Sequence, residues 1–281
     1  MTKIARHAKA ALELVHAMIY FAPEGEERYA ELGLKKGRMG YYASRSAAMG
    51  PVGPGVVAAT FYNFNPESVA KHIPAAWEIA SPAKILDARL DAVDAAMRRM
   101  LGDEFLASSE VARAAELARE ATEGCSPEGK PLYAAHADLD WPEQPHLRLW
   151  HAVTLLREFR GDAHIAALQQ AEISGIQSLV LHSTVPGGFT AEAARQLREW
   201  SEQQWARAAD ELRERGLVDA DDTITEAGEA LREEVEVATD AMSMGPWRTL
   251  SQEKVQELVS SGGSVSKALY KAGAVPTELF A

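Results

Sequence analysis

The chain has 281 residues, of which 47% are hydrophobic and 25% charged, a composition typical of a globular protein long enough for two domains. Its net charge is −12, and because nucleic-acid affinity rests on Lys and Arg neutralising phosphates, this total argues against nucleic-acid binding. The single cysteine, Cys125, excludes an internal disulfide, and no apolar run approaches the roughly 20 residues of a membrane span, so we expect a cytoplasmic protein.

Helical patterns dominate the first half of the sequence. Residues 3–21 place apolar side chains at three- and four-residue spacing, which predicts an amphipathic helix rather than a signal peptide. Asn65-Pro66-Glu67 is typical of a helix start, with Asn as the N-cap and Pro in the first turn. Long helices are expected at 82–101 and 104–122. The stretch 123–131, rich in Gly and Pro, predicts a loop.

The second half opens with a helix expected at 143–158. Gly161 should end this helix, so that Asp162 caps a short helix at 161–171. The apolar run 176–181 follows and could be a strand or a buried helix.

Farther along, the sequence predicts two helices separated by very few residues, at 190–199 and 201–215. Ser201 and Gln204 form the capping-box pattern at the start of the second helix. Residues 217–225 place two short β-compatible pieces around an acidic turn, and another helix is expected from Glu226.

A four-residue pattern that occurs twice in the sequence predicts internal duplication. Leu14-Val15-His16-Ala17 returns 135 positions later as Leu149-Trp150-His151-Ala152. At an offset of 135 to 136, two more pairs correspond: Gly50-Pro51 with Pro186-Gly187, and Phe64-Asn65 with Trp200-Ser201. The helix 85–101, moved by about the same offset, falls against the helix at 225–240. We expect an N-terminal half at 1–123, a linker at 124–142 and a C-terminal half at 143–281. The alternative is that two unrelated helical bundles align this well, because identities are sparse.

The stretch 190–240 resembles the winged-helix domain of MarR-type regulators. The residues that carry this resemblance are Leu212, Gly216, Leu217, Val218, Thr225, Gly228 and Leu231. The whole chain is similar to a family of actinobacterial helix-turn-helix-like proteins through YYASRSAAMGPV at 41–52, FYNFNP at 61–66 and LWHAVTLLREFRGDAH at 149–164. The resemblance implies a mainly α fold of tandem, pseudo-duplicated winged-helix halves with short β-hairpin wings.

The charges of this segment depart from those of a DNA-binding winged helix. The recognition-position helix, 201–216, carries Arg207, Arg213 and Arg215 against Glu202, Asp210, Glu211 and Glu214. The expected wing holds Asp219, Asp221 and Asp222. A net-negative helix is unsuited to a major groove lined by phosphates. We therefore expect DNA binding to be weak or lost.

The densest polar cluster lies at 157–164, Arg-Glu-Phe-Arg-Gly-Asp-Ala-His. It is interpreted as an anion- or carboxylate-binding corner in which Arg157 or Arg160 forks onto a ligand, with His164 nearby. The alternative is a capped helix junction whose charges face water or pair with one another.

The paired histidines and an aromatic segment supply the other candidates. His16 and His151 are either hydrogen-bonded core residues or matched imidazoles flanking a ligand, a metal or a haem. Tyr42 and Arg45, in the segment 41–51, suit an acidic or planar ligand, the alternative being an Arg whose stem packs beside a core helix. No zinc-binding motif occurs, so a dedicated zinc site is not expected.

These patterns lead to one functional hypothesis and two rivals. We expect a small-molecule-binding protein with a pocket between the halves, with haem and an acidic or aromatic metabolite as candidate ligands. The candidate ligand-binding residues are His16, Tyr42, Arg45, His151, Arg157, Arg160 and His164. One rival is a MarR-like DNA-binding regulator; the other is an enzyme with His151 or His164 as acid–base. No membrane partner is expected, and the protein would be a monomeric pseudo-dimer or a homodimer.

Overall fold

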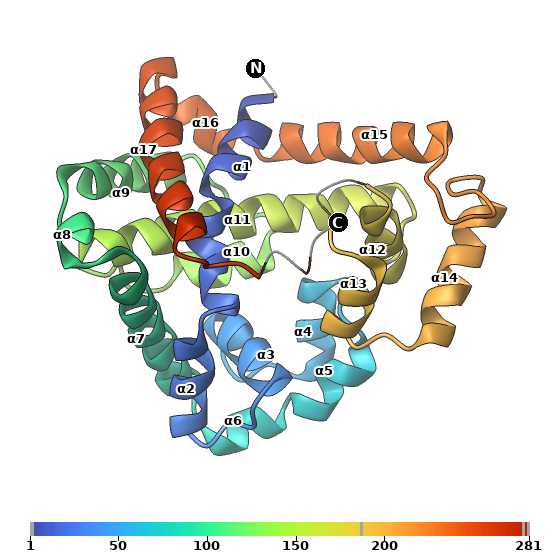
Figure 1. Ribbon diagram of the computed structural model, residues 1–281, viewed down its shortest axis with the longest axis horizontal. Coiled ribbons are helices and arrows are strands. Elements are labelled where there is room, and N and C mark those ends of the chain that lie inside the picture. The colour runs from blue at the N-terminus through green and yellow to red at the C-terminus, as the bar shows by residue number, and fades with distance from the viewer. Residues whose placement is uncertain (1–2, 186–187, 277–278, 280–281) are drawn as a thin grey trace. The chain divides into compact units, whose positions relative to one another are not determined.

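The computed structural model describes residues 3–185, 188–276 and 279, and these are mainly helical (Figure 1). In chain order, with η for short 3₁₀ helices, the elements are α1 (Lys3–Ala17), η1 (Met18–Tyr20), α2 (Pro23–Glu31), α3 (Arg38–Ser46), η2 (Ala47–Met49), α4 (Pro54–Phe61), α5 (Pro66–His72), α6 (Ala75–Ile79), α7 (Pro82–Leu101), α8 (Asp103–Leu106), α9 (Ser109–Thr122), α10 (Pro131–Ala137), α11 (Pro145–Gln170), α12 (Gly175–Ser183), α13 (Ala191–Leu197), α14 (Glu202–Glu214), α15 (Glu226–Met242), α16 (Gly245–Thr249) and α17 (Gln252–Lys271). The described residues contain isolated β-bridges but no extended strand.

Contacts group the chain into two compact units. Unit 1 comprises residues 1–52, 72–163 and 240–275, and unit 2 comprises residues 53–71, 164–239 and 276–281. Helices α11 and α15 each contribute residues to both units. The units therefore interleave along the sequence. The expected consecutive halves concern an ancestral duplication, and they stay a prediction.

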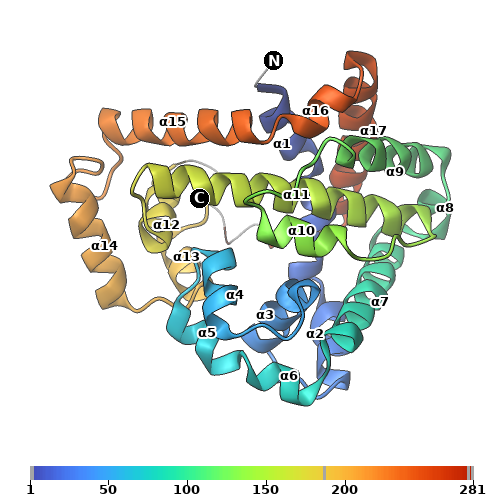
Figure 2. The same ribbon diagram turned by 180° about the vertical axis from the view of Figure 1, so that it is seen from behind.

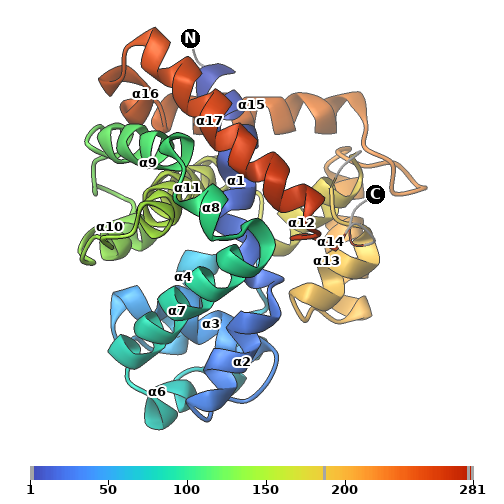
Figure 3. The same cartoon turned by 60° about the vertical axis from the view of Figure 1, so that its left-hand side comes forward.

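Unit 1 is built on close packing among its long helices. Helix α17 lies along both α1 and α9, and α2 lies along α7 (Figure 3). The apolar faces of α1, α7, α9 and α17 join α11 in one core that includes Leu12, Val15 and Leu258, each almost fully buried. Gly262 of α17 lies directly against the Leu12 side chain, leaving no room for a Cβ atom there. A small residue is thus needed where α17 meets α1.

Unit 2 contains the segment that resembles a winged helix. Helix α12 packs against α13 and α14, and its core includes Leu181, Leu212 and Val218 (Figure 1). The predicted capping box at the start of α14 is confirmed, with Ser201 and Gln204 exchanging side-chain and backbone hydrogen bonds. The expected hairpin wing is reduced to an antiparallel bridge between Val218 and Ile224.

Helix α11 corrects the prediction of a break at Gly161. Figure 2 shows one continuous helix, which replaces the two expected at 143–158 and 161–171. A glycine inside a helix costs only about 1 kcal/mol relative to alanine. Burial of neighbouring side chains such as Phe159 and Ala163 outweighs that cost.

Other boundaries depend on caps and burial. The helix expected at 104–122 is divided into α8 and α9, because the Ser108 side chain accepts a hydrogen bond from the Val111 backbone and starts α9. The apolar run 176–181 lies inside α12. The helix at 82–101 and the helix start at Glu226 are confirmed. Pro186-Gly187, one side of the expected duplicate turn, lies outside the described residues.

The described helices fall short of the length or the hydropathy that a membrane span requires. Each of them is too short or too polar to cross a bilayer.

Candidate functional site

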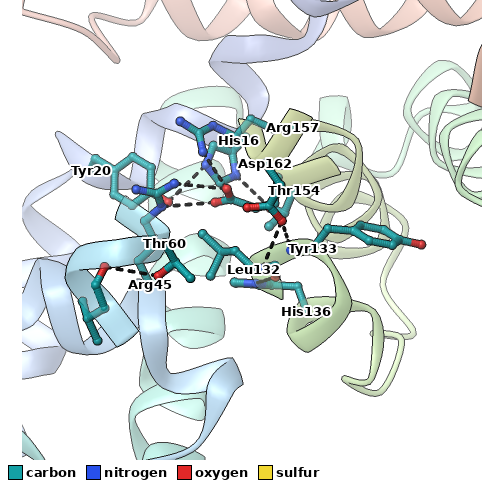
Figure 4. A network of polar contacts seen from close by, with 12 residues as sticks. His16, Tyr20, Arg45, Thr60, Leu132, Tyr133, His136, Thr154, Arg157 and Asp162 are labelled. Atoms are coloured by element: carbon teal, nitrogen blue, oxygen red, sulfur yellow. Dashed lines mark hydrogen bonds and ion pairs between the residues drawn. The ribbon is translucent and has the colours of Figure 1, made fainter. Parts of the chain in front are cut away.

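A buried ion cluster in unit 1 has Glu158 at its centre. Helix α3 supplies Arg45, and α11 supplies Arg157 and Glu158. Arg45 donates from Nε to Glu158 Oε1 and from Nη2 to Oε2, each at 3.1 Å, a bidentate pair. Arg157 Nη1 donates to the same Oε2 at 2.6 Å (Figure 4). Two guanidinium groups therefore share one carboxylate.

Electrostatics keeps all three of these groups ionised. Burial raises the pKa of Glu158, but the charges of Arg157 and Arg45 outweigh it and hold this pKa well below its usual value. Burial lowers the pKa of Arg45, but Glu158 outweighs that effect and leaves it well above its usual value. The Arg157 side chain is 30% exposed and also lies 3.9 Å from the Glu13 carboxylate, so it links the cluster to solvent.

His16 is held neutral by a chain of hydrogen bonds. Thr154 donates its hydroxyl hydrogen to the Trp150 carbonyl, so the 2.9 Å contact between His16 Nδ1 and Thr154 Oγ1 requires the proton on Nδ1. His16 Nε2 then accepts from the Tyr20 hydroxyl at 3.1 Å. Burial, followed by the charge of Arg157, lowers the pKa of His16 well below its usual value. Both ring nitrogens of His16 are therefore hydrogen-bonded.

Arg89, on the buried face of α7, is the third guanidinium of the cluster. Its side chain is 2% exposed, and its Nη1 donates to the Ser44 carbonyl at 3.3 Å. Nη2 donates to the Tyr20 hydroxyl at 3.0 Å, and the guanidinium lies 4.9 Å from the centre of the Trp150 ring. Its Nε is buried without a hydrogen-bond partner. No carboxylate in the described part of the chain pairs with Arg89.

A second histidine supplies another neutral partner for Arg89. His136 of α10 donates from Nδ1 to the Leu132 carbonyl at 2.8 Å, so its Nε2 is the acceptor that faces Arg89 Nη1 at 3.2 Å. Burial, followed by the charge of Arg89, lowers the pKa of His136 to about 4. Each group that accepts a hydrogen bond from Arg89 is therefore uncharged at neutral pH.

His151 differs from His16 because one of its buried ring nitrogens has no hydrogen-bond partner among the described residues. It is 4% exposed, and its Nε2 is buried with no hydrogen-bond partner among the described residues. Trp141 meets the ring edge to face, with centroids 4.8 Å apart. Burial, followed by the charge of Arg89, lowers the pKa of His151 to about 4, so the ring is neutral.

Asp162 ties α10 to the same face of α11. Its Oδ2 accepts the backbone N–H groups of Leu132 and Tyr133, each at 3.0 Å, at the start of α10 (Figure 4). Burial raises its pKa to about 6. The expected cap of a new helix after Gly161 is therefore wrong, because α11 continues through Gly161, and Asp162 instead caps α10, which carries His136.

In unit 2, the arginines of α14 form ion pairs with acidic residues of the same chain. Arg207 pairs with Glu211 at 3.2 Å, and Arg213 pairs with Asp210 and Asp222. Arg215, just beyond α14, donates to the Ala171 and Glu172 carbonyls.

Comparison with known proteins fits this helical arrangement. A helix-turn-helix family matches residues 5–276, nearly the whole chain. The chain belongs to this helix-turn-helix family. No curated protein and no solved structure matches it. The family assignment identifies a scaffold, and the activity must be inferred from the site, since one scaffold can serve many functions.

The structure of this family member brings several predicted site residues together and separates others. His16, Arg45 and Arg157 belong to the ion cluster, and His151 lies close enough to Arg89 for that charge to lower its pKa. Tyr42 is fully buried and lies against His72, with ring centroids 5.7 Å apart.

The remaining two predicted residues have other partners. Arg160 pairs with Asp240 at 2.8 Å and donates to Ser243 at 3.1 Å. His164 belongs to unit 2, where its Nδ1 lies 3.0 Å from the Thr239 hydroxyl. The part of the chain that the structure describes holds no group of three or more acidic, His or Cys side chains placed to bind a metal.

Sequence reasoning missed Arg89, Tyr20 and His136. A signal for Arg89 was present, because it falls four residues after Ile85 and three before Ala92 on the apolar face of α7. A charged residue in an apolar stripe predicts a buried, functional or paired charge. No comparable local signal marked Tyr20 or His136, since their role depends on helices distant in sequence.

Proposed function

We propose that this protein binds a small anionic molecule at the arginine cluster of unit 1. The observation that carries the proposal is Arg89, a guanidinium 2% exposed whose hydrogen-bond acceptors are all uncharged and whose Nε has no partner. Burying a charge is unfavourable unless a counter-charge and hydrogen bonds compensate it. A bound anion would supply both.

Arg45 provides an internal comparison for this argument. It is also buried in the same unit, at 6% exposed against 2% for Arg89, and Glu158 accepts hydrogen bonds from its Nε and Nη2. Arg89 has the same donors but no such carboxylate. Its immediate contacts, the Tyr20 hydroxyl and His136 Nε2, can hold the guanidinium in place without neutralising it. These contacts support a preorganised anion site, since they fix the group before a ligand arrives.

We also infer that α12–α15 form a winged-helix-type domain with a shortened wing. Helices α13 and α14, separated by Arg198–Ser201, are followed by the Val218–Ile224 bridge and α15, the order expected from the sequence resemblance.

Family membership favours a second candidate function, DNA binding through α14. The charges of α14 argue against this function, because the helix has a net charge of −2, from two Arg and four acidic residues. Its arginines also pair with acidic side chains within the chain. We therefore propose that DNA binding is weak or lost, and that ligand binding in unit 1 is the main function.

Thermal unfolding of the full chain tests the ligand proposal. Sodium acetate, benzoate and phosphate would be added separately at constant ionic strength, with chloride as the reference. At least one anion should raise the Tm, because a ligand that binds only the folded state stabilises it. Arg89→Gln should remove the rise, whereas Arg207→Gln, at an exposed arginine, should retain it. A wild-type Tm that no anion raises would reject the proposal.

A further inference from the structure

We propose that the anion is a planar monocarboxylate held by the Nε edge of Arg89 and by Nε2 of His151. This inference rests on the proposed function and narrows it to a class of ligand. Each of these two atoms, Arg89 Nε and His151 Nε2, is buried and lacks a hydrogen-bond partner among the described residues. The charge of Arg89 also acts on the His151 ring. A buried polar group without a partner is unfavourable, so each of the two atoms calls for one.

The geometry of the guanidinium favours a carboxylate. Nε–H and one Nη2–H of an arginine project side by side and match the two oxygens of a carboxylate. Arg45 uses this edge for Glu158, with both contacts at 3.1 Å. In Arg89, Tyr20 accepts only one of the two Nη2 hydrogens, and Nε–H is unused. A ligand carboxylate on Arg89 would reproduce the Arg45–Glu158 arrangement.

His151 adds a donor from a second helix. Its ring is neutral, so one nitrogen carries a proton and the other is an acceptor. A carboxylate beside Arg89 favours the tautomer with the proton on Nε2, because that N–H can donate to the anion. The edge-to-face contact with Trp141 limits rotation of the ring. Arg89 from α7 and His151 from α11 then bind one group from two directions.

The charge of the cluster selects a monoanion. Glu158 neutralises Arg45 and is shared with Arg157, whose other acidic neighbour is Glu13. Of the three arginines, only Arg89 is not paired with a carboxylate, since the nearby Asp162 accepts the Leu132 and Tyr133 backbone N–H groups instead. One unpaired guanidinium compensates one negative charge, whereas a phosphate group carries about −1.5 to −2 at pH 7 and would leave excess charge buried. The site therefore fits a carboxylate better than a phosphate.

Isothermal titration calorimetry of the full chain at pH 7.5 tests the ligand class. Acetate, butyrate and benzoate would be compared with acetamide, butyramide and benzamide, which keep the shape and lose the charge, and with inorganic phosphate. At least one carboxylate should bind, with its amide and phosphate each at least tenfold weaker. Phosphate binding more tightly than every carboxylate overturns this inference and leaves the proposed function standing. Absence of binding by every anion overturns both.

Two variants separate the roles of the two residues. Arg89→Lys keeps the charge and removes the paired Nε–H and Nη2–H donors, and it should weaken carboxylate binding about tenfold or more, since hydrogen bonds to charged groups are stronger than those between neutral groups. His151→Phe keeps a ring against Trp141 and should weaken binding about fivefold. Arg207→Lys is the exposed control and should bind like wild type. Circular dichroism would establish that each variant is folded. Unchanged affinity in folded His151→Phe overturns the assignment of His151, and unchanged affinity in folded Arg89→Lys overturns that of Arg89.

Discussion

Individual buried charges in unit 1 differ in how they are compensated. Glu158 meets Arg45 and Arg157, whereas Arg89 meets neutral groups. The sequence identified Arg45, Arg157 and His16 as candidates, because each stands out by its type among small, aromatic or apolar neighbours. Arg89 could have been recognised from its place in an apolar stripe. The pairing of Arg45 with Glu158, 113 residues apart, could not, because it depends on how α3 meets α11.

Removing the shared carboxylate should destabilise the fold strongly. Glu158→Gln leaves the buried Arg45 guanidinium and the partly exposed Arg157 guanidinium beside a neutral amide. Losing one partner of a buried pair costs about 3–5 kcal/mol. Urea unfolding monitored by circular dichroism would measure the loss. Glu257→Gln, which breaks an exposed pair with Arg113, is the control and should cost far less, because solvent screens exposed ion pairs. Equal effects of the two substitutions would contradict the role given to Glu158.

The buried histidines predict a loss of stability in acid. The pKa values of His16, His136 and His151 lie below the usual value of 6.5, so the unfolded state binds more protons between pH 6.5 and about 4. The free energy of unfolding should therefore decrease as the pH is lowered through this window. At pH 5, a histidine with a folded-state pKa of about 4 should lower it by about 2 kcal/mol relative to neutral pH. Asp162 opposes this partly, because its raised pKa favours proton binding in the folded state.

Urea unfolding at pH 7 and pH 5 would check the direction of this effect. His151→Phe should reduce the difference between the two pH values by about 2 kcal/mol, the contribution of one such histidine. A wild-type protein equally stable at both pH values would argue against neutral, buried imidazoles.

At the scale of helices, local signals predicted starts better than ends. The boundaries of α7 and the capping box of α14 follow from caps and periodicity, which are local properties. Gly161 was misread, because its effect on α11 is decided by tertiary burial around it. The predicted cap by Asp162 of a helix after Gly161 was also wrong. Asp162 caps α10, which precedes it by about 30 residues, a relation that no local pattern reveals.

Contact between α1 and α17 gives a matched pair of substitutions. Gly262→Ala places a Cβ against the buried Leu12 side chain and should destabilise the protein by about 1–3 kcal/mol through overpacking. Gly263→Ala meets only the Ala11 Cβ, at 3.9 Å, and should be neutral or stabilising by up to about 1 kcal/mol from helix propensity. Chemical denaturation of both variants is the measurement. Similar stability of the two would contradict the close approach at Gly262.

For the whole molecule, the sequence predicted the helical class and the helix-turn-helix family, both of which are confirmed. The β-hairpin wing was over-predicted. Residues 217–225 have β-compatible composition, but one bridge between Val218 and Ile224 is formed, with the acidic turn between them. The duplication inferred from the His16 and His151 echo stays a prediction, and the two imidazoles differ in their surroundings, since His16 is fully hydrogen-bonded and His151 Nε2 is not.

Weak DNA binding is the prediction that belongs to the whole molecule. With a net charge of −12 and the α14 arginines paired internally, the full chain should give no shift of mixed-sequence duplex DNA in 150 mM salt and only weak binding in 50 mM salt. An electrophoretic mobility assay at both salt concentrations would measure this. Tight binding that persists in 150 mM salt would instead support a DNA-binding regulator.

The central claim, that Arg89 awaits an anion, is tested most directly by NMR of arginine side chains. The Nε–Hε resonance of Arg89 can be assigned in ¹⁵N-labelled protein by its disappearance in Arg89→Lys. Titration with benzoate should move this resonance progressively downfield as Nε–H gains an acceptor, while benzamide leaves it in place. An Arg89 resonance unmoved by acetate, benzoate and phosphate alike would contradict the claim.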